Sequence, residues 1–147
     1  MSGLTLLETL LVVGVLAILL SLSLPLGLDF YQNQQLDSVS QEITQTLRRA
    51  QLRAMAGELD SSFGLFFANS QYVLFKGDSY LARDSQYDEV FEIAGAIALS
   101  GLSEIVFLKL EGKPKEGPEG FGGAIILSTN SNQKTIGING MGRVNLE

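Results

Sequence analysis

Residues 4–28 read LTLLETLLVVGVLAILLSLSLPLGL, and Glu8 is the only charged side chain among them. The uncharged run from Thr9 to Leu28 holds twenty residues. As a helix, such a run would span about 30 Å, which is the thickness of the hydrocarbon core of a bilayer. This stretch predicts a transmembrane helix, and it leaves the rest of the chain to build a globular domain with its own core.

The composition of that domain excludes several classes of function. The chain has a net charge of −6, and all 10 basic residues but only 15 of the 16 acidic residues follow residue 28. An acidic domain argues against DNA or anionic lipid as a general partner. The chain has no His and no Cys, which excludes Ser–His and Cys–His nucleophiles, His-liganded zinc and disulfides. We find no catalytic constellation, so we predict no enzyme, no metal and no cofactor; the acidic run at residues 84–92 matches no calcium-binding loop.

The N-terminal segment differs from a general secretory signal peptide. Such a peptide has a basic start, an apolar stretch of about 7–15 residues and a small-x-small cleavage site. Here no Lys or Arg precedes the apolar run, and Glu8 lies inside it, although Ser21-Leu22-Ser23 imitates a cleavage site and keeps this alternative open. A plain signal anchor explains the length but not Glu8. Placing an acidic side chain at the membrane flank costs free energy unless it is paired or stays in the headgroup layer. Glu8 therefore either sits in the headgroup layer or pairs with a cation.

One sequence motif favours the interpretation that Glu8 pairs with a cation. Gly3 is followed by LTLLE at residues 4–8, which resembles the class III signal of type IV prepilins. The resemblance implies that a prepilin peptidase cuts between Gly3 and Leu4, that the new amino group of Leu4 is methylated, and that Glu8 is the carboxylate needed for assembly. Pro25 stands where many pilins have a proline in this helix, so the resemblance gives it a role in assembly as well.

The residues after this segment predict a second helical stretch. Apolar residues recur at spacings of three and four, as on one face of an amphipathic helix over residues 32–56: Leu36, Val39, Ile43, Leu47, Ala50 and Ala54. Gly57 is a plausible stop. Pro25 and Gly27 predict an interruption or kink of the helix, either as a boundary at the membrane surface or, by the resemblance, as a segment that unwinds when a filament is stretched. If the two stretches join, residues 4–56 form one long helix of about 80 Å.

The remaining residues, 60–147, predict a β-rich head. Short apolar runs with tight turns between them favour an antiparallel sheet; these runs are residues 62–68, 71–76, 105–110, 124–128, 135–138 and 143–146. The strands should wrap the apolar face of the helix, which gives an α+β fold. The predicted organisation is thus a leader at 1–3, a transmembrane or filament-core helix at 4–28, and a globular domain at 29–147.

A narrower resemblance rests on three patterns: the Arg48-Arg49-Ala50 helix, GAIIL at residues 123–127, and the closing segment at residues 136–144 with Gly142 and Arg143. These patterns resemble the GspH/FimT minor pseudopilins. The resemblance implies a pilin fold and a subunit of a type IV pilus-like or type II secretion filament. It also implies an N-in anchor in the inner membrane, an extracytoplasmic head, and four partners: other pilin subunits, the prepilin peptidase, the inner-membrane assembly platform and membrane lipid.

Two alternatives remain. Some FimT proteins bind DNA through Gly-Arg-x-Arg, but residues 142–145 read GRVN and lack the second Arg; Arg143 is therefore the candidate contact for DNA or a protein partner in a DNA-uptake pilin. The other alternative is an extracytoplasmic binding domain that stays anchored and is never cleaved. The sequence leaves open which filament system the chain would serve.

Overall fold

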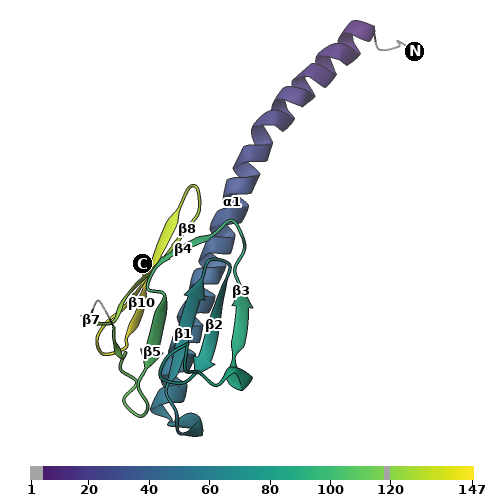
Figure 1. Ribbon diagram of the computed structural model, residues 1–147. Coiled ribbons are helices and arrows are strands. Elements are labelled where there is room, and N and C mark those ends of the chain that lie inside the picture. The colour runs from purple at the N-terminus through teal and green to yellow at the C-terminus, as the bar shows by residue number, and fades with distance from the viewer. Residues whose placement is uncertain (1–4, 118–119) are drawn as a thin grey trace.

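The computed structural model describes residues 5–117 and 120–147, without the side chains of residues 22–28, 117, 120 and 121. One long helix projects beyond a head of two antiparallel sheets that pack against its C-terminal half (Figure 1). The elements in chain order are α1 Leu6–Met55, η1 Glu58–Asp60, β1 Phe63–Ala68, β2 Gln71–Lys76, η2 Ser85–Tyr87, β3 Glu89–Glu92, β4 Ala98–Gly101, β5 Glu104–Phe107, β6 Glu116–Gly117, β7 Gly120–Phe121, β8 Gly123–Ser128, β9 Gln133–Ile138 and β10 Val144–Leu146. The predicted α+β fold is confirmed.

Helix α1 is continuous over 50 residues, a length of about 75 Å. Its first turn is capped by Thr5, whose hydroxyl accepts a hydrogen bond from the Glu8 amide at 3.3 Å. The predicted interruption at Pro25 and Gly27 is wrong, because the helix passes through both positions. A proline in a helix interior removes one hydrogen bond and can be absorbed as a bend, and Figure 1 shows α1 as a curved rod.

The C-terminal half of α1 packs as its spacing predicted. Five of the six apolar residues of the predicted face are fully buried, and Val39 is half-buried. The helix ends at Met55, and Gly57 follows in the left-handed conformation with φ 62°, as is common after a helix C-terminus. The predicted amphipathic helix and its stop are confirmed.

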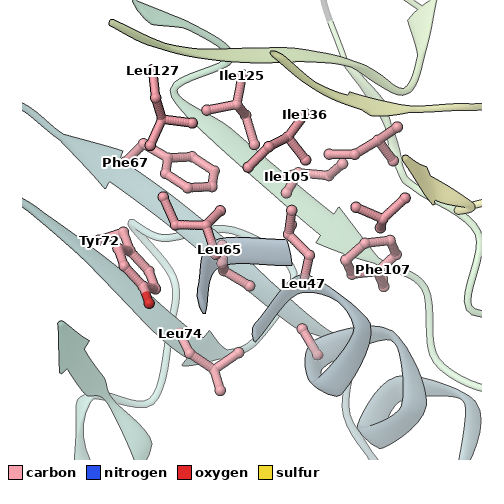
Figure 2. Close-up of a cluster of buried hydrophobic side chains, with 14 of the residues drawn as sticks. Leu47, Leu65, Phe67, Tyr72, Leu74, Ile105, Phe107, Ile125, Leu127 and Ile136 are labelled. Atoms are coloured by element: carbon pink, nitrogen blue, oxygen red, sulfur yellow. The ribbon is translucent and has the colours of Figure 1, made fainter. Parts of the chain in front are cut away.

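The head consists of two four-stranded sheets and a short β6–β7 ribbon. The first sheet has the order β3-β2-β1-β5 and the second β10-β9-β8-β4. The predicted hairpin is confirmed, since Ala68 pairs with Gln71 across a two-residue turn. Side chains from both sheets meet those of α1 in one core, and Figure 2 shows Leu47 of the helix among them, between Leu65 and Phe107.

A second apolar cluster lies on the other face of the first sheet. Val73, Phe75 and Val106 are buried there, although the alternation of a two-layer fold would expose that face. The segment over residues 77–88 covers them, and its Tyr80 stacks on Phe66 with ring centroids 3.9 Å apart. This cover explains how a strand such as β2 can be buried on both faces.

Arg53 joins the end of α1 to the head. Its guanidinium donates two hydrogen bonds to the Glu58 carboxylate, at 2.8 and 3.0 Å, and one to Glu89 of β3 at 2.8 Å. It also lies over the ring of Phe63, 4.7 Å from the centroid. The bonds to Glu58 raise the pKa of Arg53 and lower the pKa of Glu58. A lowered carboxylate pKa stabilises the fold above the group's usual pKa, and this contribution is lost as the pH falls through the lowered value.

We therefore expect Arg53→Met to destabilise the fold at neutral pH by about 1 kcal/mol, since the pairs are partly exposed. The difference from the unsubstituted chain should shrink below the lowered pKa of Glu58, where that carboxylate is neutral. Thermal unfolding followed by circular dichroism at the two pH values measures both effects. Arg143→Met is the matched control, because the Arg143 side chain is exposed. An equal loss of stability at both pH values would contradict the electrostatic explanation.

Candidate assembly surface

The first part of α1, over residues 5–21, stands clear of the head and is exposed along its whole length (Figure 1). We call it the stem. Its large apolar residues are all exposed, from 49% for Val12 to 82% for Leu6; they are Leu6, Leu7, Leu10, Leu11, Val12, Val13, Val15, Leu16, Ile18, Leu19 and Leu20. Apolar surface in water costs about 25 cal/mol per Å² relative to its burial. A surface of this extent marks a site of interaction.

The polar groups of the stem are bonded within the helix. The hydroxyl of Thr9 donates to the carbonyl of Leu6 at 2.9 Å, and that of Ser21 donates to the carbonyl of Ile18 at 2.8 Å. A hydroxyl that bonds the carbonyl three or four residues back adds no unsatisfied donor to an apolar surface. Apart from Glu8, the outer surface of the stem is therefore apolar in its chemistry.

The structure bears on the predicted membrane span at residues 4–28 only in part. No helix within the described residues combines the length and the apolar character that crossing a membrane requires. The described side chains of the stem stop at Ser21, and those of residues 22–28, including Pro25, lie outside the described part. The prediction of a transmembrane half of the helix is thus not supported by what the structure describes.

Glu8 lies in the first turn of α1, where its charge suits the positive end of the helix dipole. Its side chain is exposed, and among the described residues no donor bonds its carboxylate. Gly3 and Leu4, the residues on either side of the predicted cleavage, lie outside the described residues. Cleavage, methylation of Leu4 and pairing of its amino group with Glu8 therefore stay predictions.

The basic residues near the end of α1 bind the head. Arg48 donates to the carbonyl of Val144 at 3.2 Å, and Arg49 pairs with Glu89 at 2.7 Å. Arg143, by contrast, is exposed, and only its backbone is held, through the carbonyl oxygen of the Asn139 side chain. Arg143 thus precedes the residue whose carbonyl binds Arg48, but its own side chain points into solvent.

The acidic run at residues 84–92 is partly tied up in ion pairs. Asp84 pairs with Lys76 at 3.6 Å, and Asp88 pairs with Arg83 at 2.7 Å. Within the described residues, no group of three or more acidic side chains is placed to hold a metal ion. Asp84 therefore fastens the segment over residues 77–88 to β2, and the pair of Asp88 with Arg83 lies within that segment.

Tyr72 has the most strongly shifted pKa among the described groups. Burial raises it well above its usual value, since the ionised phenolate would lose its hydration. The ring is fully buried and stacks on Phe91 with centroids 4.8 Å apart. Figure 2 places Tyr72 beside Leu74 in the core. A shifted pKa can mark an active site, but here it marks a core residue.

The sequence did not predict two exposed aromatic residues. Phe30 and Tyr31 follow the uncharged run after the single residue Asp29, and both are exposed on α1. They fall outside the periodic face of residues 36–54, because that face records only contacts within the chain. Exposed aromatic side chains are frequent anchors of protein interfaces.

A comparison with solved structures supports the fold. No protein-family model and no curated protein matches the chain. Among solved structures, it is similar to the minor pseudopilin EpsH from the Type 2 Secretion System of Vibrio cholerae, with a TM-score of 0.58 and 11% sequence identity. The match covers 77% of this chain and 96% of that one. The chain therefore has a pseudopilin-like fold.

Proposed function

We propose that this chain is a structural and assembly subunit of a filament of the pseudopilus or type IV pilus kind. The single observation that carries the proposal is the long exposed apolar stem that projects beyond the head. The head buries a core of its own against the C-terminal half of α1, whereas the large apolar side chains of the stem are exposed along its whole length. In a filament, neighbouring subunits would cover the stem on all sides, as a helix with an apolar surface all round requires.

Glu8 would give this packing its register. Contacts between Leu and Val side chains are non-directional, so they fix no axial position between two stems. After cleavage before Leu4, its amino group would be a cation one helical turn from Glu8, and it would pair with Glu8 of a neighbouring subunit. Removing one partner of such a buried pair costs about 3–5 kcal/mol.

The processing step is tested by mass spectrometry of the chain after co-expression with a prepilin peptidase. The expected result is a mass lower by residues 1–3 and higher by one methyl group. An unchanged mass would instead support the alternative, an anchored binding domain that is never processed. The predicted inner-membrane location and the assembly platform also stay predictions, and the filament role does not depend on a membrane-crossing helix.

The assembly step is tested with Glu8→Gln, which keeps the size of the side chain and removes its charge. We expect at least a tenfold fall in the amount of this variant in sheared filaments, with an unchanged level in the cell; about 1.4 kcal/mol of the buried pair's free energy already corresponds to that factor. Asp29→Asn is the matched control, because Asp29 is an exposed acid on the same helix beyond the uncharged run. Normal entry of the Glu8→Gln variant into filaments would reject the role of Glu8.

A further inference from the structure

Four exposed apolar side chains belong to segments that lie around the C-terminal end of α1, and Figure 1 shows that this end of the helix is opposite the stem. We call Met55, Leu59, Leu110 and Met141 the distal cluster; Leu110 is 66% exposed and Met141 69% exposed. They come from three segments that are far apart in the sequence: the end of α1, the loop after β5 and the turn before β10.

Close contacts at three glycines hold these segments together. Leu110 lies over Gly57, where an added Cβ would be 3.0 Å from Leu110 Cδ2. Met55 leaves no room for a Cβ at Gly112, and the carbonyl of Gly112 leaves none at Gly142, the neighbour of Met141. The amide of Leu110 also donates to the carbonyl of Ala54 at 2.8 Å. The cluster is therefore built by the fold and is not a chance grouping of loose loops.

Two of its leucines occupy an unfavourable backbone conformation. Leu59 has φ 51° and Leu110 has φ 65°, in the left-handed region that costs a side chain with a Cβ about 1–2 kcal/mol. Glycine or asparagine adopts this region readily, and neither leucine gains a buried position in return. Apolar side chains that are exposed on a strained backbone suggest a function beyond the fold.

The charges around the cluster are neutralised within the chain. Lys109 pairs with Asp60 at 2.5 Å, Arg53 with Glu58 at 2.8 Å, and Lys113 with Glu111 at 3.4 Å. A charged partner would find few free charges there and would have to break these pairs. An uncharged apolar partner would not have to break them, so the paired charges around the distal cluster favour an apolar partner surface.

The geometry points to the stem of a second copy of this chain as the occupant of the distal cluster, an inference that rests on the proposed function. The stem beyond Glu8 is apolar and uncharged over residues 9–21, which matches the apolar partner that the paired charges around the distal cluster favour. The two surfaces lie at opposite ends of α1 and differ from each other, so their contact is heterologous. Heterologous contacts that do not close into a ring extend into an open filament, which is the assembly that the proposed function needs.

Asparagine at both strained positions tests whether the leucines serve assembly. The double variant Leu59→Asn, Leu110→Asn keeps left-handed backbone at lower strain, so its melting temperature should rise. At the same time its amount in sheared filaments should fall about tenfold. Leu81→Asn is the matched control, because Leu81 is 96% exposed on the head and lies outside the cluster. A double variant that is more stable and enters filaments like the parent chain would overturn the inference.

Disulfide trapping identifies the occupant, since the chain has no native cysteine. Cells that produce Met141→Cys and Leu16→Cys chains together should yield a crosslinked dimer after oxidation, and Leu81→Cys with Leu16→Cys should not. A dimer of Met141→Cys with itself would show a head-to-head contact and reject the stem as occupant. If the parent chain enters filaments and no crosslink forms, the inference fails alone; if the parent chain enters no filament, the proposed function fails.

Discussion

Leu47→Ala is expected to lower the free energy of unfolding by about 2–5 kcal/mol, the range for removing a large apolar side chain from a packed core. Leu47 is fully buried on α1 and lies beside Leu65 and Phe107 of the first sheet (Figure 2), in the one core that also holds residues of the second sheet. The substitution keeps the helix propensity high, so the loss reports packing and not a weaker helix. Thermal unfolding of the full chain, followed by circular dichroism, measures it.

Leu52→Ala is the matched control for that prediction. Leu52 lies on the same helix five residues further on, but it is 65% exposed. The same change of side chain there should alter stability by less than about 0.5 kcal/mol. Similar losses at Leu47 and Leu52 would mean that the helix and the head do not share one core, which would contradict the packing described above.

Much of the helix could be predicted from the sequence, because its spacing records which residues are buried. Leu36, Ile43 and Leu47 recur at helical intervals, and all three are buried. The sequence left open whether the two helical stretches join, since Pro25 and Gly27 are local signals for a break, and the structure shows that they form one helix. A single proline in a long helix removes one hydrogen bond of many, and the remaining bonds keep the helix intact.

The strands were predicted unevenly for a physical reason. The pair β1 and β2 has long apolar runs, and the predicted hairpin is confirmed. Strands β3 and β4 have only four residues each; β3 exposes alternate side chains, such as Val90, and β4 exposes all but Leu99, so no run of apolar residues marks them. The strand predicted at residues 105–110 ends at Phe107, because the chain turns back at Leu110 with a positive φ that the residue type gives no sign of.

Of the two candidate surfaces, the stem could be predicted from the sequence and the distal cluster could not. The stem and Glu8 stand out in the sequence, since one charge in a long apolar run is a local pattern. The distal cluster depends on three segments that meet only in the fold, and two of its residues are notable for backbone conformation and not for type. A surface that is continuous along the chain can therefore be predicted from the sequence, whereas a surface built from separate segments is found only in the structure.

Gly64→Ala is the second substitution for which we expect a large loss, about 1–3 kcal/mol or more, as for overpacking of a filled core. A Cβ at Gly64 would lie 2.6 Å from the carbonyl oxygen of Ile105, 2.7 Å from Phe75 Cζ and 3.0 Å from Val106 Cγ2. The carbonyl belongs to the neighbouring strand β5, so it cannot move without disturbing the sheet. The clash could be relieved only by movement of Phe75 and Val106, which belong to the apolar cluster beneath Tyr80.

Gly137→Ala separates this explanation from a general intolerance of strand glycines. Gly137 also lies inside a strand, β9, but an added Cβ there would meet nothing within 4 Å. Alanine restricts the unfolded chain more than glycine does, so this variant should be more stable by about 0.5–1 kcal/mol. The two variants make the same chemical change in the same kind of element, and we expect opposite signs. If both lose stability, the cost lies in the strands themselves, and the covered outer face of the first sheet is not the tightly packed second core that the structure indicates.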